Sequence, residues 1–196
     1  VYVARKDEER KPMVQISALA ADAYCAWAGK RLPSNAQWEY AARVEPLTGK
    51  TRRYPWGNKF SKTAARCLYE ICPLPKGTFP SWLAPIDAYP NDKSATGVRG
   101  MAGNADEWVR ECATPTIPRC GDCVDPVGPT TCAMTVVEDA QGLESVPNGR
   151  AVRGGDTPET MRGSFRLPLS ATSWRHYGFR CSTPIAAAAT VPKSSL

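Results

Sequence analysis

The chain has 196 residues, of which 42% are hydrophobic and 22% are charged. This balance excludes a disordered chain, a collagen and a coiled coil, and no apolar run reaches the roughly 20 residues of a membrane-spanning helix. The 18 prolines and 15 glycines predict a fold rich in loops. The single histidine, His176, excludes a site built from three histidines of this chain.

The net charge of +6 is unevenly distributed, because residues 63–149 are acidic and both flanks are basic. Such asymmetry is one sign of a nucleic-acid partner. Here the basic residues are scattered singly among glycines and prolines, so we interpret them as solvated surface and expect no nucleic-acid binding.

The first elements in chain order are a charged arm and two helices. Residues 1–11 alternate in charge and predict a solvated arm. A helix that begins at Ser17 and ends near Gly29 is predicted by one apolar stripe, formed by Ile16, Leu19, Ala20, Ala23, Tyr24 and Trp27. Ser34 and Gln37 have the spacing of a capping box and predict a second helix directly afterwards.

Long loops and then short strands are predicted for the rest of the chain. Between Val44 and about Gly149, proline, glycine, aspartate and asparagine recur, which is typical of loops that are functional or cross-linked. Short strands bounded by glycine or proline are predicted at 150–153, 163–167 and 177–181. The tail, residues 183–196, is low in complexity.

Six segments, in this order and spacing, resemble one known family. They are AYCAWAGKRLP (23–33), QWEYAAR (37–43), YPWGN (54–58), MAGNADEW (101–108), VRGG (152–155) and GFRC (178–181). Together they resemble the formylglycine-generating enzyme (sulfatase-modifying factor) family over about residues 12–181.

The resemblance implies an α+β fold that is a variant of the C-type lectin fold. Such a domain has little regular structure, long loops, and a small twisted antiparallel sheet with two adjacent helices. The family domain is predicted at residues 12–182, between the arm and the tail. Because family domains carry a further N-terminal portion, we expect that this portion is missing here.

The best-known activity of the family is copper-assisted oxidation of a sulfatase cysteine to formylglycine. It requires a Cys-x4-Cys pair on the strand after the Gly-Gly turn, because soft thiolates suit Cu(I). Ser164 and Leu169 stand at the matching positions, and no cysteine occurs between Cys132 and Cys181. We therefore expect neither copper nor this activity in the chain.

The eight cysteines, an even number, suggest disulfides. The resemblance implies a bridge between Cys25 and Cys181, as in secreted relatives, and hence an extracytoplasmic location. Cys67 and Cys72 repeat the Cys-x4-Cys spacing, for which a short-loop disulfide is favoured over a relocated metal or redox pair. Local disulfides of open connectivity are also favoured over a zinc site for four further cysteines, Cys112, Cys120, Cys123 and Cys132.

A calcium site at residues 103–107 is also implied by the resemblance. Its ligands would be the carboxylate of Glu107 and the backbone carbonyls of Gly103 and Ala105. Gly100 stands where relatives supply a side-chain oxygen, and calcium needs six to eight oxygens. The alternative is that Glu107 is a structural carboxylate bound by backbone amides.

Retained scaffold motifs beside a lost thiol pair favour a non-catalytic module that binds a protein or peptide. The candidate ligand groove carries Arg162, Arg166, Trp174 and His176. Two alternatives stay open, because a fold does not determine a function. One is an active enzyme of the family, an oxidoreductase acting on cysteine, and the other is a structural domain of a larger extracytoplasmic assembly.

Overall fold

The computed structural model describes residues 9–67, 71–72, 83–113, 126–132, 135–139, 142–146, 149–170 and 177–183. Its two helices, α1 (Ala18–Trp27) and α2 (Asn35–Arg43), precede all of its strands. The strands are β1 (Asp106–Cys112), β2 (Thr135–Asp139), β3 (Gly142–Val146), β4 (Gly149–Arg153), β5 (Leu167–Ser170) and β6 (Tyr177–Phe179). Neither helix of these ranges has the length and apolar character needed to cross a membrane.

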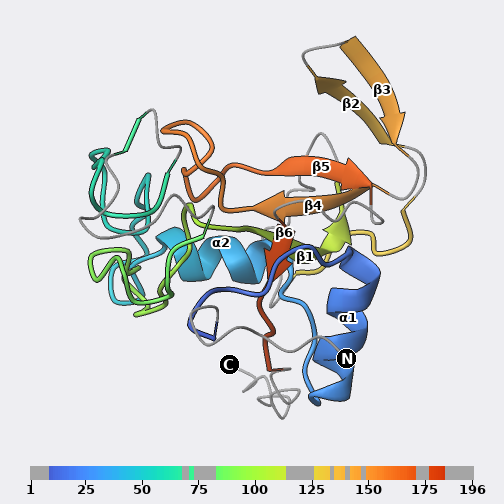
Figure 1. Ribbon diagram of the computed structural model, residues 1–196, viewed down its shortest axis with the longest axis horizontal. Coiled ribbons are helices and arrows are strands. Elements are labelled where there is room, and N and C mark those ends of the chain that lie inside the picture. Colours follow the sequence, from blue (N-terminus) through green and yellow to red (C-terminus); the bar gives the residue numbers. More distant parts are fainter. Residues whose placement is uncertain are drawn as a thin grey trace, which may run out of the picture.

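A four-stranded sheet in the order β5-β4-β1-β6 lies at the centre of the molecule (Figure 1). β4 pairs antiparallel with β1 on one side and with β5 on the other. β6 runs parallel to β1, with Glu107 opposite Gly178, so the prediction of an antiparallel sheet is wrong at this strand. Parallel pairing is feasible because the long chain between the two strands, which includes β4 and β5, supplies the crossover. β2 and β3 form a separate antiparallel pair.

Both helices begin at the predicted residues because a serine side chain caps each of them. Ser17 accepts a hydrogen bond from the amide of Ala20. Ser34 and Gln37 form the complete capping box, in which each side chain accepts from the backbone amide of the other residue. These local bonds satisfy amides that have no partner within the first helical turn.

Helix α1 does not bury the apolar stripe that its sequence predicts. Leu19 is 57% exposed, Tyr24 51% and Trp27 80%, whereas the buried residues of the helix are Ala18, Ala21 and Cys25. These small residues share a core cluster with Trp108 and Val152 of the sheet. The prediction is wrong because the helix packs closely on the sheet through its small side chains, which leaves the large ones outside.

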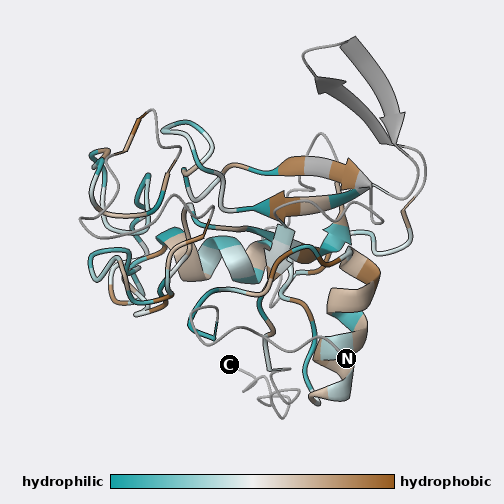
Figure 2. Ribbon diagram, in the orientation of Figure 1, coloured by the Kyte–Doolittle hydropathy of each residue, from teal (hydrophilic) through white to brown (hydrophobic). Residues whose placement is uncertain are grey.

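Two further clusters complete the core. Trp38 and Ala42 of α2 pack with Met101, Val109 and Ala151. The third cluster joins Tyr54, Ala65, Ala102 and Met161 to the cysteines Cys67 and Cys72. Hydrophobic segments of β4 and β5 are visible in Figure 2.

The predicted strand at 163–167 begins only at Leu167. The amide of Phe165 donates to the carbonyl of Arg162, as in a turn. The carbonyls of Ser164 and Phe165 accept from Nη1 of the buried Arg153, at 3.2 and 2.9 Å. Because both carbonyls accept hydrogen bonds from the Arg153 side chain, they do not pair with a neighbouring strand.

Three disulfides cross-link the described residues. Cys25 of α1 is bonded to Cys181 just beyond β6, as the resemblance implied. Cys67 is bonded to Cys72, which agrees with the short-loop interpretation, and Cys112 is bonded to Cys132. Cys120 and Cys123 lie outside the described residues.

Candidate functional site

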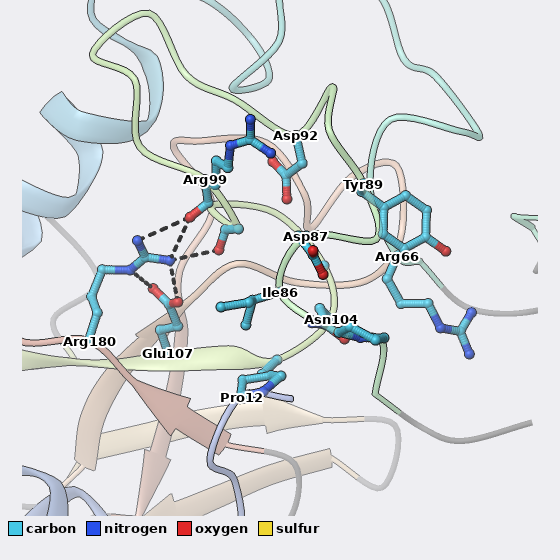
Figure 3. Close-up of a pocket in the computed structure, with 14 residues that line it drawn as sticks. Pro12, Arg66, Ile86, Asp87, Tyr89, Asp92, Arg99, Asn104, Glu107 and Arg180 are labelled. Atoms are coloured by element: carbon cyan, nitrogen blue, oxygen red, sulfur yellow. Dashed lines mark hydrogen bonds and ion pairs between the residues drawn. The ribbon is translucent and has the colours of Figure 1, made fainter. Parts of the chain in front are cut away.

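A cavity of about 490 Å³ lies beside the N-terminal end of β1 (Figure 3). One wall is the segment from Arg99 to Glu107, and another is the loop from Pro85 to Asp92. Pro12, Arg66 and Arg180 complete the lining. This volume lies in the range of small-molecule binding sites. We call it the β1 cavity.

Two residues in the left-handed backbone conformation shape the wall before β1. Gly103 has φ of 68° and Asn104 has φ of 65°. A Cβ atom on Gly103 would lie 1.8 Å from the carbonyl oxygen of Arg66, so only glycine fits. The side chain of Asn104 accepts from the amide of Ala84 at 2.8 Å and donates to its carbonyl at 3.0 Å. These bonds hold the loop of the opposite wall against β1.

Glu107 is buried at one end of the cavity in an ion pair with Arg180. Arg180 donates from Nε to Oε2 and from Nη2 to Oε1, each at 2.5 Å, and Trp38 donates from Nε1 to Oε2 at 2.7 Å. Arg180 also donates to the carbonyl of Gly100 at 2.8 Å. Burial opposes the charge of the guanidinium, but Glu107 raises the pKa of Arg180 overall. Glu107 is therefore a structural carboxylate, bound by a guanidinium and an indole.

The three predicted calcium ligands do meet in this cavity, because Gly103, Ala105 and Glu107 all line it. However, both Glu107 oxygens are bound by Arg180, and the carbonyl of Gly103 accepts from the amide of Ala105 at 2.8 Å. As arranged, this set does not fit a calcium ion, because a cation already lies beside the carboxylate. Calcium binding stays a prediction that requires Arg180 to move away.

Asp92 and Tyr89 are cavity residues that the sequence did not reveal. Asp92 is only 5% exposed, and its Oδ1 atom has no hydrogen-bond partner within the described structure. The hydroxyl of Tyr89 is likewise buried without a partner in that part of the chain. Burial raises the pKa of Asp92 to about 7, although Arg180 lowers it. Burial also raises the pKa of Tyr89, and nearby Arg66 opposes this shift.

The side chains of the recognisable motifs form two buried networks that meet at Trp38. One is the Trp38–Glu107–Arg180 network. In the other, Arg153 donates from Nη2 to Glu39 at 2.8 Å, and its guanidinium lies over the Trp38 ring at 5.0 Å from the centroid. One ion pair thus joins the motifs QWEYAAR and VRGG, another joins MAGNADEW and GFRC, and the indole of Trp38 links α2 to the second pair.

A second carboxyl group is perturbed at the start of β1. Burial, and then repulsion by Asp156, raises the pKa of Asp106 to about 7, while the amide of Gly155 opposes the shift. Within the described residues, no group of three or more histidine, cysteine, aspartate or glutamate side chains is arranged to hold a metal ion.

The positions predicted for the catalytic thiols follow the Gly-Gly turn in the sequence. Ser164 is exposed in a turn, and Leu169 lies in β5 and packs against the first core cluster. Of the predicted groove, Arg162 is exposed and Arg166 is half-buried. Neither arginine lines the β1 cavity. Trp174 and His176 lie outside the described residues.

Comparison with known proteins places these observations in a family. Residues 2–185 match the sulfatase-modifying factor enzyme 1-like domain. The chain is 35% identical over 185 residues to a formylglycine-generating enzyme of Streptomyces coelicolor, covering 87% of this chain and 52% of that protein. It is 38% identical over 107 residues to an inactive C-alpha-formylglycine-generating enzyme 2 of Bos taurus, covering 50% and 32%.

The chain spans about half the length of the formylglycine-generating enzyme that it matches. Among solved structures, Treponema denticola variable protein 1 superposes with a TM-score of 0.64 at 16% identity, covering 91% of this chain and 73% of that one. At this identity the likeness shows a shared fold alone. The label of a C-type lectin fold stays a prediction.

Proposed function

Because the chain belongs to the sulfatase-modifying factor enzyme 1-like family, we propose that it is a non-catalytic member that binds a protein or peptide ligand. The state of the cysteines carries this proposal. The six cysteines that the structure describes are all in disulfides, and none occurs between Cys132 and Cys181. The strand after the Gly-Gly turn therefore offers no thiolate. One relative carries a name that describes it as inactive.

The chemistry of the matching positions supports the same conclusion. The hydroxyl of Ser164 is a hard ligand and the side chain of Leu169 is not a ligand, so neither replaces a thiolate on Cu(I). Cys67 and Cys72 are buried in the third core cluster and bonded to each other, so a relocated thiolate pair has no support. Of the residues predicted for the ligand surface, the structure describes Arg162 and Arg166.

The three disulfides support an extracytoplasmic, oxidising location, because such bonds persist there and are rare in the cytosol. A structural domain of a larger assembly is compatible with this location. It differs from a binding module in having no ligand of its own.

The proposal is tested by incubating the protein with copper, oxygen, a reductant and a Cys-x-Pro-x-Arg peptide. We expect an unchanged peptide mass, whereas the S. coelicolor enzyme, used as a positive control, converts the cysteine to an aldehyde. Aldehyde formation by this chain would refute the proposal. Loss of that activity in Cys67→Ser would then identify the pair responsible.

A further inference from the structure

The outward face of helix α1 consists entirely of uncharged residues. The side chains that it exposes are Leu19, Ala20, Ala23, Tyr24, Ala26 and Trp27. We call this set the α1 face, and at 3.6 residues per turn it spans about 160° of the helix circumference. We propose that the α1 face binds the same face of a second copy of this chain, with the two helices antiparallel about a twofold axis near Ala23.

The first argument is that α1 is apolar on both of its sides. Ala18, Ala21 and Cys25 pack on the sheet, and the α1 face lies opposite them at the edge of the molecule (Figure 1). Asp22 is the only charged residue of the helix, and it is half-buried at the margin of the face. A surface helix normally exposes charged or polar side chains, and a helix that is apolar all round is normally buried. The α1 face therefore has the composition of a covered surface.

The two aromatic rings of the face are already fixed in position. The ring centroid of Tyr24 lies 5.6 Å from that of Trp27 and 5.4 Å from that of Phe179 in β6. The disulfide between Cys25 and Cys181 fixes the helix beneath them. Aromatic side chains often dominate the binding energy of an interface, and fixed ones lose little conformational entropy when a partner binds.

The second argument is the area of the face, which suits a weak dimer. Leu19 is 57% exposed, Tyr24 51% and Trp27 80%. Because a whole aromatic side chain covers about 150–250 Å², the six residues together offer on the order of 500 Å² on each copy. An apolar patch of this size is typical of an interaction site. Two copies would bury about 1,000 Å², which is near the lower limit for a specific interface.

The third argument is that the face complements itself. A twofold axis makes the same patch serve on both copies. With the axis near Ala23, the small central side chain lets the two helices approach closely, and positions four residues before and after it lie opposite each other. Trp27 of each copy then packs on the partner's Leu19, so both large side chains are covered in the same arrangement.

The charges around the face favour antiparallel over parallel helices. Lys30 is exposed just beyond the end of α1, and in a parallel pair the two lysines would meet. In an antiparallel pair they lie at opposite ends, about 15–20 Å apart, which exceeds the Debye length at physiological salt. The net charge of +6 makes two copies repel each other at longer range. Added salt should therefore strengthen this dimer, because it screens the repulsion and leaves the apolar contact intact.

Sedimentation velocity of the whole chain measures the association. Between about 2 µM and about 1 mM we expect a change from monomer to dimer, with a dissociation constant on the order of 0.1 mM. Raising sodium chloride from about 50 to about 500 mM should tighten the dimer several-fold. A chain that stays monomeric at about 1 mM, or a dimer that salt weakens, would overturn the proposal.

Two matched lysine variants locate the interface. Trp27→Lys should weaken the dimer about tenfold or more, because it removes the largest side chain of the face from both copies. Leu47→Lys is the control, because Leu47 is 97% exposed but lies outside the α1 face, and its dimer should be unchanged. Both variants add one positive charge at an exposed position, so equal effects would overturn the proposal.

A mixture of two variants tests the antiparallel arrangement. Leu19→Glu and Trp27→Lys each place a charge against an apolar side chain, so each alone should dimerise weakly. In the mixed pair the new carboxylate faces the new ammonium, and the other half of the interface keeps its native contact. The mixture should therefore associate several-fold more tightly than either variant alone. Parallel helices would place equal positions opposite each other, so a mixture without this gain would overturn the arrangement.

Other occupants of the α1 face would give different results. A monomeric chain that dimerises only after residues 184–196 are removed would assign the face to the tail of the chain. A monomeric chain that binds phosphatidylglycerol vesicles, and loses this binding in Trp27→Lys, would assign the face to a membrane surface. Either result would overturn the second copy as the partner. The aldehyde assay does not depend on self-association, so the proposed function is tested separately.

Discussion

Replacing Asp92 by asparagine is expected to stabilise the protein at neutral and alkaline pH. Burial raises the pKa of this carboxyl from 3.8 to about 7 in the folded state. Between these values the folded protein holds a proton that the unfolded chain has released. The free energy of unfolding therefore falls as the pH rises from about 4 to about 7. Above about pH 7 this carboxyl causes no further decrease.

The size of the effect follows from the pKa shift. Three pKa units correspond to about 4 kcal/mol, which is an upper bound because local relaxation reduces the penalty. The backbone amides of Gly100 and Met101 hydrogen-bond to the Asp92 side chain. Asparagine cannot ionise, but it has the shape of the protonated aspartate, and its amide oxygen can accept from the same two amides. Asp92→Asn should thus gain about 2–4 kcal/mol at pH 8 and almost nothing at pH 4.

Urea unfolding followed by tryptophan fluorescence at pH 4, 6 and 8 measures this difference. Asp106, whose pKa is also raised to about 7, is present in both proteins and cancels from the comparison. Asp87→Asn serves as the control, because Asp87 is half-exposed and paired, and its effect should be small at every pH. The reasoning is refuted if Asp92→Asn changes the free energy of unfolding equally at pH 4 and pH 8, or destabilises the protein at pH 8.

The remaining expectations concern the disulfide and the two ion-pair networks. Replacing Cys25 and Cys181 together by serine should reduce the free energy of unfolding by up to about 5 kcal/mol, measured by urea titration, because the bond closes a loop with a sequence separation of 156. Arg153→Met should reduce the free energy of unfolding by about 3 kcal/mol, because it breaks a buried ion pair with Glu39. Arg43→Met removes a more exposed pair with the same glutamate and should reduce it by less than about 1 kcal/mol. Equal losses in the two variants would contradict the argument that burial makes the Arg153 pair more important. Arg180→Met should increase calcium affinity about tenfold in calorimetric titration, because it frees Glu107, and unchanged affinity would argue against calcium at this site.

Features set by neighbouring residues could be predicted from the sequence. The caps at Ser17 and Ser34 depend on a residue and the amide three positions later. β4 lies within one residue of the predicted segment, because glycines bound it and its residues favour extended structure. The motifs also located the family and, through it, the bridge between Cys25 and Cys181.

Features set by distant residues could not be predicted. β1 has no alternating pattern, because it lies at the centre of the sheet and both of its faces are largely buried. The buried face of α1 could not be predicted from its apolar stripe, because apolarity alone does not show which face of a helix packs on the sheet. Asp92 follows Pro90 and Asn91, so locally it is typical of a turn, and only the fold places it in a cavity.

The bond between Cys25 and Cys181 also determines how the domain responds to mechanical force. Tension applied through the two chain ends passes directly from one sulfur to the other and bypasses the intervening loop, whose ends are 156 positions apart. At about 3.4 Å per residue, a hidden length on the order of 500 Å is released only after the bond is reduced. Both ion-pair networks and the β1 cavity lie between these two cysteines in the sequence, apart from Pro12 at the cavity rim. In a longer chain, tension can therefore pull α1 away only as far as Cys25, whereas the residues between the two cysteines are not stretched until the bond is reduced.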